Sequence, residues 1–142
     1  MEVSNKVYPN KAQIEGFSES GVEGQICMVN LLKFKPKAEY PDGRETNLTG
    51  KEAYHIYSEG VMRLLKSIGG YIGFAGDVSR LTLGEVDELW DAVVLAFWPS
   101  RQAMLELMQS DAMQEISIHR TAGLAGQLNI ETTNFSGSLI KS

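Results

Sequence analysis

His119 and Asp91 are the two titratable residues in the sequence that could act as a general base and its orienting carboxylate. Histidine exchanges a proton near neutral pH more readily than other side chains, and a carboxylate beside it can hold the imidazole in place. Both residues have structural alternatives. His119 could serve as a cation at a helix C-terminus. Asp91 could instead pair with Arg80 or Arg120 at the start of a strand, and this structural pairing is the favoured interpretation.

A second group of residues could contact a ligand: Asn30, Tyr54, Tyr57, Arg120 and Trp90. Asn30 lies in an apolar run, and a buried amide without hydrogen bonds costs about 1–3 kcal/mol. It therefore either binds a ligand carbonyl or fastens a neighbouring loop. Tyr54 and Tyr57 are expected on adjoining faces of one helix, with hydroxyls able to reach inward. Most such tyrosines are amphipathic core residues with a hydrated tip, so a structural role is again the alternative.

Other kinds of site find little support in the composition. Cys27 is the only cysteine, which excludes an intrachain disulfide and a thiolate zinc site. Glu52 and His55 have the Glu-x-x-His spacing of di-iron bundles, but such sites need a second pair and further carboxylates. The glycines of GGYIGFAG follow a helix, whereas a phosphate loop opens one. We therefore expect no metal and no cofactor.

The charge and hydropathy of the chain bear on its partners and location. A net charge of -5 argues against nucleic-acid binding, which needs a basic surface. No segment approaches the roughly 20 apolar residues of a membrane span. The first 24 residues lack the apolar core of a signal peptide. These features predict a cytoplasmic protein that contacts neither membrane nor nucleic acid.

The 142 residues fit one domain, with a helical lead-in over residues 1–24 and a tail over 134–142. Capping residues and apolar periodicity predict helices over 11–20, 50–68, 101–108 and 110–120, and strands over 25–34, 70–82, 88–98 and 126–135. Gly69 should close the second helix in a left-handed conformation. After the extra N-terminal helix, the order strand, helix, strand, strand, helix, strand predicts a ferredoxin-like α+β sheet with helices on one face.

The strands over 25–34 and 88–98 are apolar on both faces. An antiparallel sheet with helices on one side normally alternates apolar and polar residues, so something must cover the second face. A second copy of the sheet would do so, giving a barrel-like homodimer. The alternative is that the N-terminal helix or the C-terminal tail covers this face within one chain.

Five motifs occur in an order that resembles a known family. They are MVNLLKF (28–34), GKEAYHIYSEG (50–60), IGGYIGFAG (68–76), WDAVVLAFWPSRQAM (90–104) and HRTAGLA (119–125). Together they resemble the domain-of-unknown-function (DUF) family numbered 1330. This resemblance implies the dimeric α/β-barrel superfamily, whose members include cofactor-free monooxygenases, isomerase-like enzymes and haem-binding enzymes. It implies a dimer but no single function.

These observations predict a pocket between sheet and helices for a small, partly apolar organic molecule. With His119 as base and Asp91 as its partner, the protein would be a cofactor-free enzyme of proton transfer, isomerisation or oxygenation. The alternatives are a binding module without chemistry and a dimerisation domain with a filled core. Open space walled by Asn30, Tyr54 and His119 would favour the enzyme or the binding module, and a filled core would favour the dimerisation domain.

Overall fold

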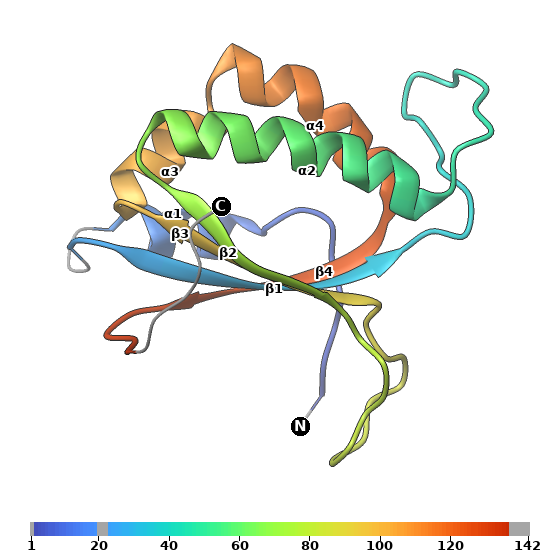
Figure 1. The fold of residues 1–142 in the computed structure, drawn as a ribbon, viewed down its shortest axis with the longest axis horizontal. Coiled ribbons are helices and arrows are strands. Elements are labelled where there is room, and N and C mark those ends of the chain that lie inside the picture. Colours follow the sequence, from blue (N-terminus) through green and yellow to red (C-terminus); the bar gives the residue numbers. More distant parts are fainter. Residues whose placement is uncertain (1, 20–22, 137–142) are drawn as a thin grey trace.

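The computed structural model describes residues 2–19 and 23–136, which form one sheet with helices packed on it (Figure 1). The elements are α1 (Lys11–Ser18), β1 (Ile26–Phe34), α2 (Gly50–Ser67), β2 (Tyr71–Asp77), β3 (Ala92–Trp98), α3 (Arg101–Met108), α4 (Asp111–Gly123) and β4 (Leu124–Thr132). The strand order is β2-β3-β1-β4, with every neighbouring pair antiparallel. This is the ferredoxin-like α+β arrangement that the element order predicts.

The expected helix boundaries come from local chemistry. Asn10 and Gln13 form a capping box at the start of α1, and Thr49 and Glu52 form another at the start of α2. A side-chain oxygen that accepts a bond from a first-turn N–H satisfies a donor that has no partner within the helix. Gly69 follows α2 with a φ of 90°, a conformation that costs glycine little.

The strand ends differ from the sequence-based boundaries. β2 stops at Asp77 and β3 begins only at Ala92, so residues 78–91 form a long connection that projects away from the sheet (Figure 1). Seven of its fourteen residues are polar or charged, and its two limbs meet at the base, where the backbone N–H of Val78 donates to the carbonyl oxygen of Asp91 at 2.9 Å. β4 begins at Leu124, directly after α4 and earlier than the polarity of the segment suggested. Its pairing with β1 shifts register between Lys33 and Phe34.

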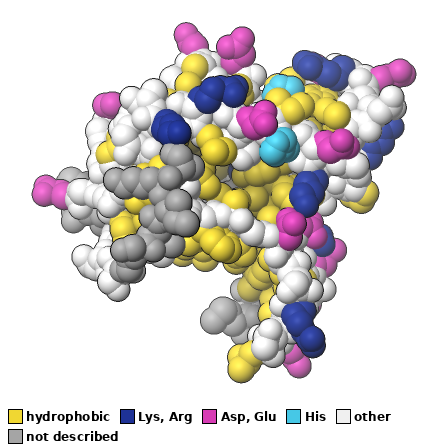
Figure 2. All heavy atoms as spheres, in the orientation of Figure 1, with side chains coloured by type: hydrophobic (Ala, Val, Ile, Leu, Met, Phe, Trp, Pro, Cys, Tyr) yellow, Lys and Arg dark blue, Asp and Glu magenta, His cyan; other side chains and the backbone are white. Residues whose placement is uncertain are grey.

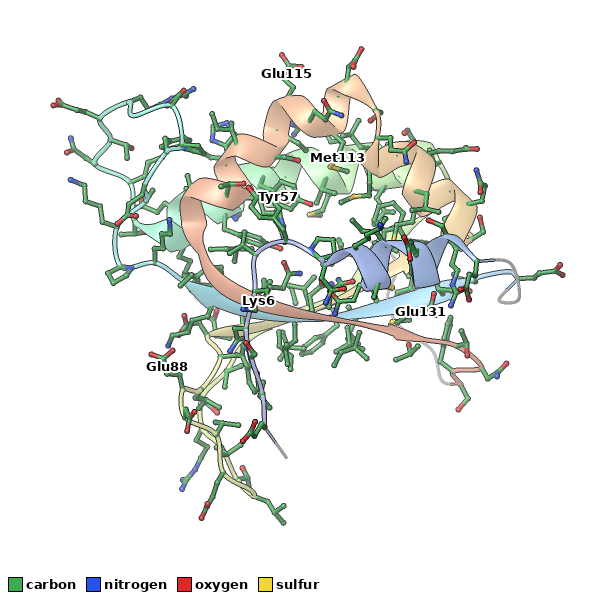
Figure 3. The ribbon with its side chains drawn as sticks, turned by 180° about the vertical axis from the view of Figure 1, so that it is seen from behind. Lys6, Tyr57, Glu88, Met113, Glu115 and Glu131 are labelled. Carbon is green, nitrogen blue, oxygen red and sulfur yellow. The ribbon has the colours of Figure 1, made fainter. Side chains whose placement is uncertain are left out.

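One face of the sheet packs under α2, α3 and α4 (Figure 1). The residues of β1 that point to this side are buried: Ile26, Met28, Asn30 and Leu32. Residues 5–9 of the lead-in run beside β4, where Lys6 forms an antiparallel β-bridge with Gln127 (Figure 3). None of the described helices is both long and apolar enough to cross a membrane.

The opposite face of the sheet is also apolar. Val29, Leu31 and Leu95 are half-buried there, while Phe74 is 49% and Ile130 46% exposed. Figure 2 shows hydrophobic side chains gathered along the lower side of the sheet. Within residues 2–19 and 23–136 no helix covers this face. The C-terminal stretch contributes one contact, in which the ring of Phe135 lies 5.2 Å from that of Phe97.

Candidate functional site

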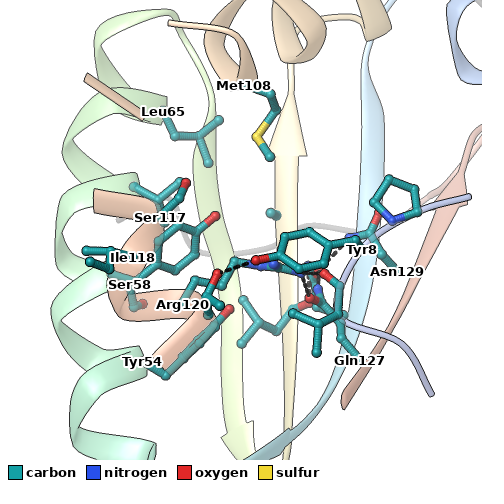
Figure 4. A pocket seen from close by; sticks show the side chains of 18 of the residues that line it. Tyr8, Tyr54, Ser58, Leu65, Met108, Ser117, Ile118, Arg120, Gln127 and Asn129 are labelled. Atoms are coloured by element: carbon teal, nitrogen blue, oxygen red, sulfur yellow. Dashed lines mark hydrogen bonds between the residues drawn. The ribbon is translucent and has the colours of Figure 1, made fainter. Parts of the chain in front are cut away.

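A cavity of about 680 Å³ lies between the helix layer and the sheet (Figure 4). Pockets for small organic molecules span roughly 300–1,000 Å³. Its walls come from the lead-in, from β1, β2, β3 and β4, from α2, α3 and α4, and from the loop after β1.

Apolar side chains make up one end of the cavity. They are Val61, Leu65, Ile72, Ala96, Trp98, Met104 and Met108. Figure 4 places Leu65 and Met108 together at this end. The labelled residues Tyr54, Arg120 and Gln127 lie at the other end, so the cavity is polar at one end and apolar at the other.

Asn30 is the buried amide at the centre of the polar end, where it is 9% exposed. Its Nδ2 donates to the carbonyl oxygens of Met28 and Val94, each at 3.2 Å. Its Oδ1 accepts from Gln127 Nε2 at 2.7 Å and from Asn129 Nδ2 at 2.5 Å. The hydrogen-bonding capacity of this amide is therefore used within the protein. Asn30 thus fastens the neighbouring strands β3 and β4 to β1, whereas the sequence-based alternative is that it fastens a loop.

Arg120 is held at the polar end by neighbours that carry no charge. Its Nη2 donates to the carbonyl oxygen of Val7 at 2.9 Å and to Oε1 of Gln127 at 2.5 Å. Gln127 thereby links Arg120 to Asn30. No acidic side chain among the described residues forms an ion pair with this guanidinium.

Tyr54 and Tyr57 line the cavity from α2, and Figure 3 shows Tyr57 between the helices and the sheet. Burial raises the pKa of both phenols above the ordinary value, and the positive charge of Arg120 partly offsets this. Both hydroxyls therefore stay protonated at neutral pH and can donate hydrogen bonds. Neither has a hydrogen-bond partner among the described residues. Every described side-chain oxygen that is inaccessible to solvent has a hydrogen-bond partner. The two unpaired hydroxyls are therefore accessible, and they open onto the cavity that their residues line.

The lead-in borders the polar end of the cavity through Val7, Tyr8 and Pro9. The Tyr8 hydroxyl lies 2.8 Å from Oγ1 of Thr121 on α4. Sequence reasoning missed this contact, because nothing local in residues 5–9 indicates that they lie over a distant helix. Gln127 and Asn129 were also missed, although their spacing of two in a strand was a usable signal: it places both on the face that Asn30 shares.

The structure does not bring Asp91 and His119 together. Asp91 Oδ2 accepts from the backbone N–H of Phe34 at 2.9 Å, and Oδ1 lies 3.5 Å from Lys33 Nζ. Asp91 thus fastens the start of β3 to the end of β1, with Lys33 in place of the expected arginine. Asp91 lies beside the end of β1 because β1 and β3 pair antiparallel, with the first residue of β3, Ala92, opposite Leu32.

His119 lies outside the residues that line the cavity. Its Nδ1 is 2.7 Å from the hydroxyl of Tyr40, in the loop after β1, and the two rings meet edge to face. Burial, together with the positive charge of Arg44, lowers the pKa of this imidazole. The turn of α4 that directs Arg120 into the cavity directs its neighbour His119 toward this loop.

Trp90 also lies away from the cavity. It precedes β3, and its Nε1 donates to Oδ1 of Asn5 at 2.6 Å. In a strand over 88–98, alternation would place Trp90 on the same face as Val94, Ala96 and Trp98, which do line the cavity. Because the strand begins only at Ala92, that alternation does not extend to Trp90. The indole instead ties the lead-in to the base of the 78–91 connection.

Comparison with solved structures gives clear matches. Two structures of RPA0582, one of them of the methylated protein, superpose with TM-scores of 0.84 and 0.83. They are 32% and 29% identical to this chain and cover 94% of it, and this chain covers 98% and 100% of theirs. RPA0582 is described as a protein of unknown function from Rhodopseudomonas palustris.

Two more distant structures are also similar. At3g17210 from Arabidopsis thaliana matches with a TM-score of 0.50 and 17% identity, over 80% of this chain and 99% of its own, which is a likeness of fold. A Dabb-family protein with a ferredoxin-like fold from Mesorhizobium loti matches with a TM-score of 0.48 and 10% identity, over 80% and 100%. No protein-family model and no curated protein matches the sequence.

Proposed function

We propose a function for this chain from the premise that it belongs to the family of RPA0582, the Rhodopseudomonas palustris protein of unknown function. In this proposal the protein is a homodimer, and each subunit binds a small, partly apolar organic molecule. The binding site is the cavity between sheet and helices. We further propose that the family is the one that the five ordered motifs resemble, the DUF family numbered 1330, with the dimeric α/β barrel that this implies.

The observation that carries the proposal is the cavity itself. Its volume of about 680 Å³ lies within the range of ligand pockets, and mostly apolar walls surround a small set of polar groups. Burial of apolar ligand surface against such walls is favourable by roughly 25 cal/mol per Å². A domain whose only task is dimerisation has no need of such a space.

The geometry supports binding better than the expected proton transfer. The proposed base, His119, bonds to Tyr40 and lies outside the cavity lining, and Asp91 bonds to the end of β1. The carboxylate of Asp42 also lines the cavity, but it is bound by Arg44. The guanidinium of Arg120 and the hydroxyls of Tyr54 and Tyr57 face the cavity as well, and all of them can donate hydrogen bonds. These groups orient a ligand, and at neutral pH none of them is a base. We therefore take the non-catalytic binding module as the leading function.

Binding can be tested with the neutral apolar fluorophore N-phenyl-1-naphthylamine, whose emission rises when it leaves water. Val61 lines the cavity from α2, whereas its neighbour Met62 is 37% exposed on the outer side of the same helix. Val61→Phe should fill part of the cavity and weaken binding of the fluorophore on the order of tenfold, because the phenyl ring occupies space in which the fluorophore would bury apolar surface. Met62→Phe is the matched control and should bind as the wild type does. Wild-type protein without any saturable signal, or equal binding by both variants, would refute the proposal.

A further inference from the structure

Arg120 is a cation in the cavity wall that pairs with no acidic side chain in the described part of the chain. A guanidinium has five N–H donors, and Arg120 uses only Nη2, toward Val7 and Gln127. Its Nε and Nη1 donate to no described residue. Among the described residues, Asp42 is the only acidic one that lines the cavity, and its carboxylate already binds Arg44 through Nε and Nη2. A half-buried cation of this kind gains most from an anion supplied from outside the chain.

Two further donors face the same space. The hydroxyls of Tyr54 and Tyr57 open onto the cavity without a partner, and Tyr57 is 7% exposed. Figure 4 shows Tyr54 next to Arg120 at the polar end. Hydroxyls that open onto a cavity can exchange water for an acceptor on a ligand. One acceptor between them could take hydrogen bonds from all three donors.

The oxygens nearby do not compete for this role. Asn30 Oδ1 is occupied by Gln127 and Asn129, and Gln127 Oε1 by Arg120. The Tyr8 hydroxyl lies against Thr121. The unused hydrogen-bonding capacity at the polar end therefore consists mainly of donors, while the far end offers only apolar contact from residues such as Leu65 and Met108.

We propose that the ligand of this cavity is an amphipathic carboxylic acid, with its carboxylate bound by Arg120, Tyr54 and Tyr57 and its apolar body directed toward Leu65 and Met108. Planar carboxylates match the guanidinium in geometry and charge. The inference rests on the proposed binding function and adds the chemical class of the ligand. The amide chain from Asn30 through Gln127 holds the guanidinium in position, so these two are positioning residues.

Matched ligands separate the charge from the apolar body. Octanoate and octanamide have the same aliphatic chain, and each can be titrated against bound N-phenyl-1-naphthylamine. Wild-type protein should release the fluorophore at a concentration of octanoate on the order of ten- to a hundredfold lower than that of octanamide, because a hydrogen bond to a charged group is the stronger one. In Arg120→Gln this preference should fall to near one, because the charge that distinguishes octanoate from octanamide no longer has its partner. Arg63→Gln, on the exposed side of α2, is the control and should keep the preference.

A second variant keeps the test decisive if Arg120→Gln fails to fold. Tyr57→Phe removes one hydroxyl and leaves the ring, so the preference for octanoate should drop about two- to tenfold. If wild-type protein binds octanamide as well as octanoate, the cavity binds apolar molecules and the carboxylate inference is wrong. It is equally wrong if the preference survives in both variants. If neither ligand displaces the fluorophore and the fluorophore itself does not bind, the proposed function has failed together with the inference.

Discussion

Asn30 connects the sheet to the polar end of the cavity, and its hydrogen bonds predict a specific cost of removal. Asn30→Leu leaves the donor of Gln127 without its acceptor in a half-buried position. We expect the free energy of unfolding to fall by about 1–3 kcal/mol, measured by urea denaturation. Asn129→Ala removes one of the same hydrogen bonds from an exposed residue and should cost less than about 1 kcal/mol. Equal costs for the two variants would contradict the central position of Asn30.

His119 predicts a pH dependence of stability. Its pKa is lowered in the folded protein by burial and by the charge of Arg44, so the unfolded chain binds the proton more tightly. Stability is therefore complete above the unfolded pKa and declines as the pH falls through it. The free energy of unfolding should decrease as the pH falls through about 6.5, the ordinary pKa of histidine, and His119→Gln should flatten that decrease. The carboxyl groups of Asp42, Glu52 and Glu131 have lowered pKa values and act only at more acidic pH. An identical pH profile in wild type and variant would contradict this assignment.

At the scale of elements, α2 and α4 cross where both have glycine. A Cβ on Gly123 would lie 2.9 Å from the backbone nitrogen of Tyr54 and closer still to the carbonyl oxygen of Gly50. The carbonyl of Gly123 also accepts from the backbone N–H of Lys35 at 2.8 Å. This crossing brings the start of α2, with Tyr54 just after its first turn, against the last turn of α4, with Arg120. The close approach of the two helices therefore sets the spacing of the donors in the cavity.

Gly123→Ala should consequently lower the free energy of unfolding by about 1–3 kcal/mol, because the backbone on the other side of the contact cannot move away. Gly16→Ala on α1 is the control. No atom lies within 4 Å of a Cβ built there, and alanine is favoured over glycine inside a helix by roughly 0.5–1 kcal/mol. Urea denaturation of both variants gives the comparison. A neutral Gly123→Ala would mean that the crossing is looser than the structure has it.

Helix ends can be predicted from the sequence alone, whereas contacts between distant segments cannot. The caps at Asn10 and Thr49 and the stop at Gly69 are local signals, and each is found where the sequence predicts it. The order of strands and helices follows from these signals and from the apolar runs. Pairings between distant segments do not, because they depend on register. The separation of Asp91 from His119 is one such case, and the link from Arg120 to Asn30 through Gln127 is another.

For the whole molecule, the apolar outer face of the sheet predicts a dimer. Burial of each Val- or Leu-sized side chain contributes about 1.5–3 kcal/mol, against an association cost of roughly 4–15 kcal/mol. The apolar residues on this face that would contribute are Val29, Leu31, Phe74, Val93, Leu95, Leu128 and Ile130. Those that are already half-buried would contribute less than the full amount each. A second copy placed there would cover both sheets at once.

Ile130→Lys tests this assembly without disturbing the fold of a single chain. Ile130 is 46% exposed, so a monomer tolerates the lysine, whereas a dimer interface would have to desolvate its ammonium group, which is costly for an unpaired charge. Light scattering after size-exclusion chromatography should give twice the 15.7 kDa chain mass for wild-type protein and the single chain mass for the variant. Met62→Lys, on the outer side of α2, should remain dimeric. A monomeric wild type, or an Ile130→Lys protein that stays dimeric, would assign the apolar face to contacts within one chain, as the position of Phe135 over Phe97 already does at one end of the sheet.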